Sequence, residues 1–245
     1  MKFIGIIPAR YQSTRFPGKP LAMIHDKPMI QWVYENVSQA LDQVCVATDD
    51  QRIMEVVQGF GGNVIQTLSS HQSGTDRCAE AARLLADTVD FDVVINIQGD
   101  EPFIKPDQIE VLKTCFLDSE VQIATLVKKI ESEEEILNQN RPKVVLDTNN
   151  NALYFSRSPI PFVRGLDTSD WLNRNTFWAH IGMYGFKAEV LQQVTGLPQG
   201  SLEIAESLEQ LRWLENGYKI RAAETWTQSP GIDTPEDLQE ALKHF

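Results

Sequence analysis

Residues Ile6–Pro20 read IIPARYQSTRFPGKP, and this stretch decides the fold class. An apolar, strand-like run ends at Pro8, and the loop that follows carries Arg10, Arg15 and Lys19. Proline and glycine keep this loop from continuing as a helix. The first 25 residues contain four Lys or Arg side chains and no carboxylate, although the whole chain has a net charge of -12. Such local positive charge predicts a site for a small polyanion and not for nucleic acid, which needs a broad basic surface.

The composition is that of a globular protein. With 245 residues, 42% hydrophobic and 23% charged, the chain is expected to form a single domain over residues 1–245. Its apolar runs are shorter than the roughly 20 residues that span a bilayer, and Pro8 interrupts the first run too early for a signal peptide. The cysteines Cys45, Cys78 and Cys115 lack CxxC spacing, which is typical of reduced core residues in a cytoplasmic protein.

Apolar runs alternate with stretches of helical period. This pattern predicts an α/β, Rossmann-like fold with a mostly parallel central sheet flanked by helices. The expected strands are residues 2–8, 43–48, 63–66, 92–97 and 122–127. Ligands of such folds bind at the carboxyl ends of the strands, so the polar residues that follow each strand are the candidates for function.

The regular alternation breaks near residue 143. The runs KVVLD and ALYFSR flank the polar tract 148–151, which predicts a hairpin over 143–157, and the proline-containing loop 158–175 is a candidate arm or interface. A strand over 177–186 and one helix over 202–216 are expected next. Thr234 and Pro235 predict the start of the last helix.

The cationic loop differs from the familiar phosphate-binding motifs. It lacks GxxxxGK[ST], since Pro20 follows Lys19, and it also lacks GxGxxG. Free backbone N–H groups and three cationic side chains are still suited to wrapping a triphosphate. The alternative interpretation is a solvated basic loop.

A carboxylate follows the buried run VVINIQG directly. Asp100 lies at the carboxyl end of that expected strand, where burying an unpaired charge costs several kcal/mol. Magnesium offsets such a cost and bridges phosphate oxygens through one or two protein carboxylates. The alternative role for Asp100 is a turn residue, and Glu101 beside it is interpreted as a solvated neighbour.

Eight ordered segments resemble one family, the 3-deoxy-manno-octulosonate cytidylyltransferases or CMP-Kdo synthetases. The resemblance runs from residue 3 to the C-terminal helix, and the segments are IIPARYQSTRFPGKP, HQSGTDR, NIQGDEP, KVVLD, YFSR, HIGMYGF, LEQLR and GIDTPEDL. It implies transfer of CMP from CTP to the acidic sugar 3-deoxy-D-manno-octulosonate (Kdo), with Mg²⁺ as cofactor and pyrophosphate as second product. CMP-Kdo then serves lipopolysaccharide synthesis. The resemblance also implies a cytoplasmic homodimer whose residues 143–186 contribute sugar-binding and dimer-arm elements.

The resemblance assigns roles residue by residue. It makes Arg10, Arg15, Lys19 and Asp100 catalytic, and Asp100 and Asp233 the metal ligands. The nucleotide-binding positions are Pro8, Ala9, Arg10, Arg15, Lys19, Gln72, Ser73, Thr75, Arg77, Gln98 and Asp100. The sugar-binding positions are Arg157, His180, Tyr184, Glu209 and Gln210.

Several of these residues have structural alternatives. Ser73 and Asp233 each precede an expected helix and suit a helix cap, His180 suits a buried core position, and Glu209 suits a solvated helix face. One departure from the family is Ala179, where Lys or Arg usually precedes the histidine; Arg174 is the nearest preceding cation.

Two other functions are weighed against the leading one. A cytidylyltransferase for a sialic acid typically begins with a PARGGSKG type of loop, which YQSTRFPGK is not. A catalytically silent nucleotide-binding protein would have no need of the carboxylate pair Asp100 and Asp233.

Overall fold

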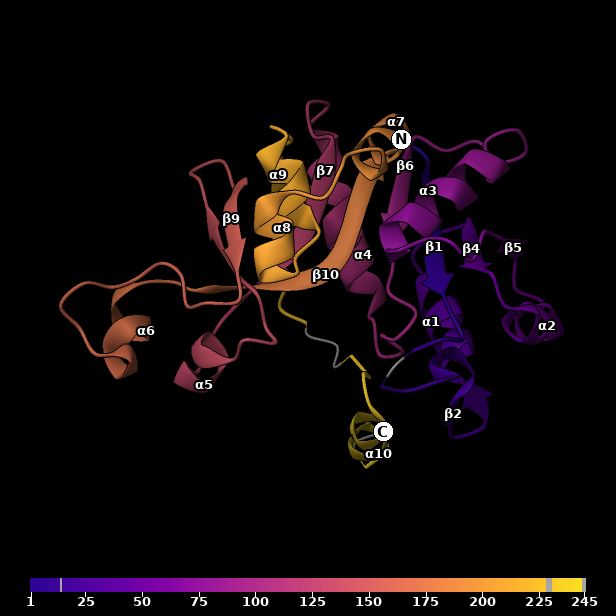
Figure 1. Ribbon diagram of the computed structural model, residues 1–245, viewed down its shortest axis with the longest axis horizontal. Helices are drawn as coiled ribbons and strands as arrows, with labels where there is room; N and C mark the ends of the chain where they lie inside the picture. Colours follow the sequence, from indigo (N-terminus) through magenta and orange to yellow (C-terminus); the bar gives the residue numbers. More distant parts are fainter. Residues whose placement is uncertain (14, 228–230, 244–245) are drawn as a thin grey trace. The chain divides into compact units, whose positions relative to one another are not determined.

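A computed structural model describes residues 1–13, 15–227 and 231–243. The chain forms two compact units. Unit 1 contains residues 1–110, residues 185–195 and the described residues after 227, and unit 2 contains residues 111–184 and 196–227. Both units combine helices with strands (Figure 1), and the predicted α/β fold class is confirmed.

Unit 1 contains a parallel sheet with the strand order β6-β1-β4-β5. Its elements are β1 (Phe3–Ala9), η1 (Lys19–Leu21), β2 (Met23–Ile24), β3 (Lys27–Pro28), α1 (Met29–Val37), β4 (Val44–Thr48), α2 (Gln51–Gly59), β5 (Val64–Gln66), α3 (Gly74–Leu85), β6 (Val93–Asn96), α7 (Ala188–Thr195) and α10 (Pro235–Ala241). Ile6 lies at the centre, paired with Asn96 on one side and Cys45 on the other. The sheet interior is apolar along β1, so its first polar positions occur where the strands end.

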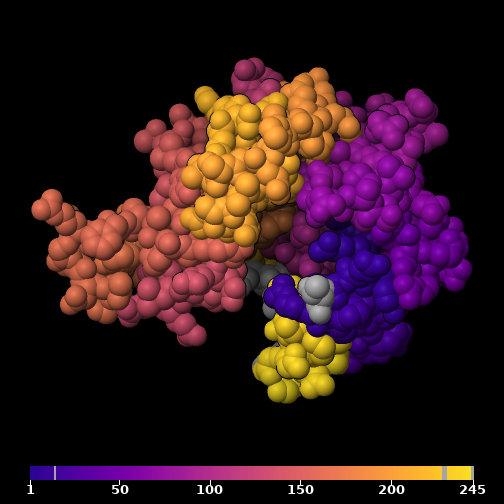
Figure 2. All heavy atoms as spheres, viewed as in Figure 1, coloured from indigo at the N-terminus to yellow at the C-terminus, as the bar shows by residue number. Residues whose placement is uncertain are grey.

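The C-terminal helix belongs to unit 1. Thr234 caps α10 and accepts a hydrogen bond from the N–H of Asp237, as predicted. Ile232 and Ala241 pack with Met29 and Phe103 in one apolar cluster. In Figure 2 the yellow atoms of this helix lie against the indigo N-terminal segment, so the two ends of the chain share one core.

Unit 2 contains a parallel pair, β7 with β11, and an antiparallel hairpin, β8 with β9. Its elements are η2 (Cys115–Leu117), β7 (Ile123–Lys129), α5 (Glu133–Leu137), β8 (Lys143–Leu146), β9 (Ala152–Ser156), η3 (Thr168–Asp170), α6 (Trp171–Arg174), α8 (Ser201–Glu206), α9 (Gln210–Glu215) and β11 (Ile220–Glu224); α4 (Pro106–Thr114) and β10 (Trp178–Lys187) contain residues of both units. The predicted hairpin over 143–157 is confirmed. Asp147 forms its turn by accepting hydrogen bonds from the N–H groups of Asn149 and Asn151.

The structure corrects two predictions in unit 2. The single helix expected over 202–216 is divided into α8 and α9, because Ser207 adopts a left-handed conformation (φ 51°) that ends α8. The loop expected over 158–175 contains η3 and the short helix α6. Trp171 of α6 is buried and its ring stacks on Phe177 at 5.7 Å, so apolar burial orders part of this segment.

The three cysteines are buried, as expected for core residues. Burial raises the pKa of Cys45 to about 12 and that of Cys115 to about 11, so neither thiol ionises near neutral pH. Among the described residues, no helix is long and apolar enough to cross a membrane.

Candidate active site

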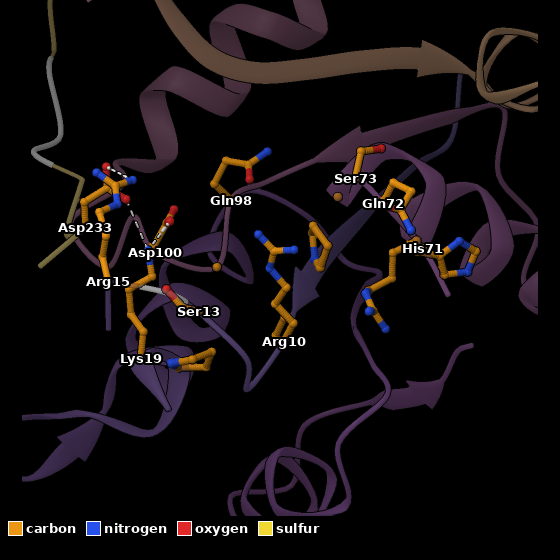
Figure 3. A pocket seen from close by; sticks show the side chains of 16 residues that line it. Arg10, Ser13, Arg15, Lys19, His71, Gln72, Ser73, Gln98, Asp100 and Asp233 are labelled. Carbon is orange, nitrogen blue, oxygen red and sulfur yellow. Dashed lines mark hydrogen bonds and ion pairs between the residues drawn. The ribbon is translucent and has the colours of Figure 1, made fainter. Parts of the chain in front are cut away.

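A cavity of about 340 Å³ opens in unit 1 where β1 and β6 end. Figure 3 shows Arg15, Asp100 and Asp233 at one end of it and His71, Gln72 and Ser73 at the other, with Arg10 and Gln98 between them. The residues that line it are Pro8, Ala9, Arg10, Ser13, Arg15, Lys19, Pro20, His71, Gln72, Ser73, Gly74, Arg77, Gln98, Gly99, Asp100 and Asp233. The cavity therefore has a charged end and a polar, mostly uncharged end.

The cationic loop is closed on itself between Tyr11 and Gly18. The N–H of Gly18 donates to the carbonyl of Tyr11 at 2.8 Å, and one 3-10 turn, η1, starts at Lys19. Gly18 has a φ of 74°, and a Cβ there would lie 3.1 Å from the Tyr11 ring, so the turn requires glycine. This closure brings Arg10, Arg15 and Lys19 to one cavity, although they are spread along the loop.

Two carboxylates meet these cations. Nζ of Lys19 lies 2.6 Å from Asp100 Oδ2 and 3.4 Å from Asp233 Oδ1, and a terminal guanidinium nitrogen of Arg15 lies 3.0 Å from Asp233 Oδ2. The N–H of Ile232 donates to the carbonyl of Asp100 at 2.9 Å, which explains why residues 133 positions apart in sequence share one site. The neighbouring Glu101 is partly buried and not solvated as interpreted from the sequence; burial, with a smaller effect of Asp100, raises its pKa to about 8.

Asp100 and Asp233 are suited to holding Mg²⁺. The Lys19 ammonium lies within ion-pair distance of both carboxylates, so a single cationic centre already interacts with the two side chains at once. Mg²⁺ in nucleotide sites commonly takes one or two protein carboxylates and completes its coordination with phosphate oxygens and water. Among the described residues no group of three or more His, Cys, Asp or Glu side chains has the arrangement of a metal site. The donor set therefore fits a metal that arrives with phosphate ligands.

The polar end of the cavity is built at the start of α3. Ser73 caps this helix, accepting the N–H of Asp76 at 3.0 Å, so the capping role is confirmed, and the same residue lines the cavity. Gly74 lies close to the Pro8 ring, where a Cβ would approach to 3.2 Å. The helix start therefore lies directly beside the end of β1, with Gln72 at the cavity wall.

Two residues predicted to bind the nucleotide at this end, Arg77 and Thr75, have polar groups that contact other side chains of the protein. Arg77 lines the cavity but is buried; its guanidinium donates to Thr67 at 2.6 Å and pairs with Asp49 at 3.2 Å. Thr75 is buried beside Asn96 and is not among the cavity-lining residues.

Ser13 and His71 also line the cavity, and the sequence reasoning did not select them. Nε2 of His71 lies 2.5 Å from Oε2 of Glu80, and the same carboxylate accepts the N–H of Leu68. Ser13 lies in the segment PARYQSTRFPGKP and His71 in the segment HQSGTDR, and both segments resemble the family. Their place in these segments is the sequence signal that could have identified them.

The residues predicted to bind the sugar belong to unit 2. His180 Nε2 lies 3.0 Å from the Thr125 hydroxyl, and its ring packs against those of Phe155 and Tyr184. Burial lowers the pKa of His180 to about 3, which keeps the imidazole neutral. His180 is only partly buried, so it is not the fully enclosed core histidine of the alternative interpretation. Its ring nitrogen is within hydrogen-bond distance of the Thr125 hydroxyl.

Glu209 and Gln210 lie at the start of α9. Arg212 pairs with Glu209 at 2.9 Å and with the buried Glu203 at 3.1 Å. Gln210 is 5% exposed, and its side-chain Nε2 has no hydrogen-bond partner among the described residues. A buried amide nitrogen without a partner is costly in a folded protein, so a polar ligand at this position would relieve that cost.

The departure from the family at position 179 has a local explanation. Ala179 is buried among Ile130, Trp171 and Phe177, so its side chain fills part of an apolar cluster. Arg174, the nearest preceding cation, is exposed at the end of α6.

The partly buried His180, whose pKa is lowered, makes stability depend on pH. In the folded protein His180 takes up a proton only near pH 3, whereas in the unfolded chain it does so near 6.5, so the unfolded state binds more protons between these values. The free energy of unfolding should therefore fall as pH is lowered through 6.5, by about 2 kcal/mol at pH 5 from this residue. Urea unfolding at pH 7.5 and pH 5 would measure the loss. His180→Gln should reduce it by that amount; an equal loss in both proteins would contradict the assignment.

A cationic loop lies beside two carboxylates at the carboxyl ends of parallel strands. This arrangement is that of a nucleotide-binding enzyme of the nucleotidyltransferase class. Residues 4–220 match the cytidylyltransferase family. The chain belongs to this family. Relatives that are 59% and 58% identical over nearly its full length place it, within the family, among the 3-deoxy-manno-octulosonate cytidylyltransferases.

Similarity to named relatives extends over the full chain. The 3-deoxy-manno-octulosonate cytidylyltransferase of Parabacteroides distasonis is 59% identical over 246 residues, which cover 99% of this chain and 97% of that protein. The enzyme of the same name from Bacteroides thetaiotaomicron is 58% identical over 244 residues, covering 98% and 97%. A solved structure of CMP:2-keto-3-deoxy-manno-octonic acid synthetase complexed with CTP is 42% identical, with a TM-score of 0.91 and coverage of 100% of this chain and 98% of that one.

Proposed function

We propose that the cavity of unit 1 binds CTP and that the enzyme transfers CMP from it to Kdo, releasing pyrophosphate. The observation that carries this proposal is the convergence of Lys19, Asp100 and Asp233 on one point at the charged end of the cavity. Family membership supplies the nucleotide and the sugar, because relatives of this chain are named for 3-deoxy-manno-octulosonate and one similar solved structure is complexed with CTP.

The reaction forms one phosphorus–oxygen bond and breaks another. The anomeric hydroxyl oxygen of Kdo attacks the α-phosphorus and gives its proton to water, and the bond from that phosphorus to the oxygen bridging to the β-phosphate breaks. The electron pair leaves with pyrophosphate. Arg10, Arg15 and Lys19 hold the triphosphate and neutralise the charge that develops on the leaving group, which is the main protein contribution in such transfers.

Asp100 and Asp233 would hold Mg²⁺, which supplies charge neutralisation at the phosphates. The backbone where β1 ends, at Pro8 and Ala9, approaches the nucleotide. Pro8 offers only its carbonyl, whereas Ala9 also has an N–H to donate. Gln72, Ser73 and the amide of Gln98 present donors and acceptors to the cytosine at the polar end of the cavity.

The sugar is assigned to Arg157, His180, Tyr184, Glu209 and Gln210 of unit 2. Arg157 has five N–H donors, of which three donate to backbone carbonyls. The other two donors have no hydrogen-bond partner in residues 1–13, 15–227 and 231–243, and we assign them to the sugar carboxylate. The unpartnered Nε2 of Gln210 supports a ligand rich in hydroxyl groups at the start of α9.

The same proposal includes a homodimer and a role in lipopolysaccharide synthesis in the cytoplasm. Residues 143–186 expose large apolar side chains, among them Leu153 and Phe162, which supports a contact between subunits in this region. The buried thiols with raised pKa values fit a reducing compartment.

The decisive experiment measures pyrophosphate release by the purified protein with CTP, Mg²⁺ and Kdo. Release is expected with this combination, and replacing CTP by UTP or Kdo by a sialic acid should reduce it strongly. Release with sialic acid but not with Kdo would identify a cytidylyltransferase for that sugar. CTP binding without turnover of either sugar would identify a silent nucleotide-binding protein.

A further inference from the structure

Lys143 of β8 is a fully buried charged side chain, with 0% of its surface exposed. Its Nζ donates to the carbonyl of Asn138 at 2.8 Å and to that of Arg157 at 2.7 Å, and no carboxylate of the described residues bonds the amine directly. Burying an ammonium group in this way is costly, whereas methionine would fill a similar volume without that cost. Packing alone therefore does not explain a lysine at this position.

The two carbonyls that accept from Lys143 are close in the chain to the groups that hydrogen-bond the Arg157 side chain. The guanidinium of Arg157 donates through Nε to the carbonyl of Glu206 at 2.7 Å and through its two terminal nitrogens to those of Gln139 at 3.1 Å and Ser207 at 3.2 Å. Asn138 and Gln139 are consecutive, so the two cationic side chains hold one short segment from both of its carbonyls. Removing either cation would take away one of these contacts, and the segment would then be held by the other cation and by its backbone bonds, from the N–H of Asn138 to Glu134 and from the N–H of Arg141 to Asn138.

The network is also unbalanced in charge. Glu206 is the carboxylate beside the two cations, and its oxygens already accept the Ser156 hydroxyl at 2.6 Å and the N–H of Arg157 at 2.9 Å. Burial lowers the pKa of Lys143, Arg157 lowers it further, and Glu206 raises it. With Lys143 and Arg157 both charged, Glu206 is the one carboxylate that the described residues place beside two positive charges. The excess positive charge attracts anions, and it does so more strongly at the buried Lys143 than it would in water.

We propose that Lys143 is a positioning residue that sets the specificity of this site for acidic sugars. It fixes the backbone around Arg157, so that the two free donors of the guanidinium are held toward the sugar carboxylate, and its own charge favours an anionic over a neutral sugar. This inference rests on the proposed function, since it takes Arg157 as the group that binds the carboxylate. Lys143 itself does not touch the sugar.

The test compares Kdo with its carboxamide, which keeps the anomeric hydroxyl but lacks the negative charge. Lys143→Met should raise KM for Kdo about tenfold or more, leave KM for CTP within about twofold, and reduce the preference in kcat/KM for Kdo over the carboxamide. Lys129→Met is the matched control, because Lys129 is exposed in the same unit, and it should behave as wild type. Equal losses with Kdo and carboxamide, or a raised KM for CTP, would overturn the proposal.

Two further variants distinguish a failure of the role proposed for Lys143 from a failure of the sugar site proposed at Arg157. If Lys143→Met does not fold, Lys143→Gln replaces it in the comparison of Kdo with the carboxamide. The glutamine amide retains donors for the two carbonyls, while the charge is lost. Arg157→Ala tests the proposed sugar site independently: an unchanged KM for Kdo would remove that assignment. A raised KM for Kdo in Arg157→Ala, together with wild-type behaviour of the Lys143 variants, would overturn only the role of Lys143.

Discussion

Replacing Asp100 by asparagine is expected to lower kcat by roughly 10²- to 10³-fold without unfolding the protein. The carboxamide keeps the size and the turn-forming capacity of aspartate but cannot neutralise a cation. Asp100 pairs with Lys19 at 2.6 Å, with 33% of the Asp100 side chain exposed, so the substitution removes an ion pair that water still reaches. The cost in stability should therefore be small compared with the loss of turnover.

The measurement is pyrophosphate release at saturating Mg²⁺, CTP and Kdo, alongside thermal unfolding. Asp42→Asn provides a matched control in the same unit, because Asp42 is exposed and lies away from the cavity-lining residues. It should retain wild-type turnover. If Asp100→Asn also retained full turnover at saturating Mg²⁺, Asp100 would be a turn residue and the metal assignment would fail.

The strands in the first half of the chain were predictable because each is marked by its own local sequence. Strands such as β1 and β6 are continuous apolar runs, and residues that follow parallel strands meet at one edge of the sheet. This reasoning placed Asp100 at the functional edge of the sheet, and the family resemblance assigned Lys19 to the same site; the structure brings the two within 2.6 Å. Asp233 was different: its place beside Asp100 comes from the packing of Ile232 in a distant apolar cluster and from the hydrogen bond of the Ile232 N–H to the Asp100 carbonyl. No local sequence pattern predicts these contacts, and only the family resemblance indicated the role of Asp233.

The second half was harder because distant contacts decide local conformation there. The periodic apolar residues of 202–216 predicted one helix, but Ser207 in a left-handed conformation ends α8, and its carbonyl is held by Arg157, fifty residues earlier. Strand β11, with the sequence IRAAE, was not predicted because alanine and charged residues have little preference for strands. It is ordered by pairing along its whole length with β7.

The burial of Lys143 was likewise invisible in the sequence. A lysine at the start of a hairpin strand is usually solvated, and the run KVVLD gives no sign that this one is enclosed. In the structure Lys143 lies on a central strand, paired with Ser156 of β9 on one side and Ala179 of β10 on the other, and these contacts between distant segments are not visible in the run KVVLD. The small side chain at position 179, the departure from the family, thus lies directly opposite the buried lysine.

Lys19→Met should change two measured quantities in opposite directions. The efficiency with CTP, kcat/KM, should fall by roughly 10²-fold or more, because the ammonium group no longer binds the triphosphate or stabilises the leaving pyrophosphate. The affinity for a divalent cation in the absence of nucleotide should rise, by about tenfold or more, because a positive charge 2.6 Å from Asp100 and 3.4 Å from Asp233 is removed. Methionine keeps the length and packing of the lysine stem.

Binding of Mn²⁺, followed by the loss of its free-ion electron paramagnetic resonance signal, measures the second effect without turnover. Arg10→Met is the matched control: Arg10 lines the same cavity, and no ion pair joins it to Asp100 or Asp233 within the described residues, so it should weaken use of CTP but leave Mn²⁺ affinity unchanged. An Mn²⁺ affinity that did not rise in Lys19→Met would mean that the two carboxylates do not form one cation site. The opposite signs matter because general damage to the cavity would weaken both ligands, whereas only a lysine that competes with the metal for the same oxygens would weaken one and strengthen the other.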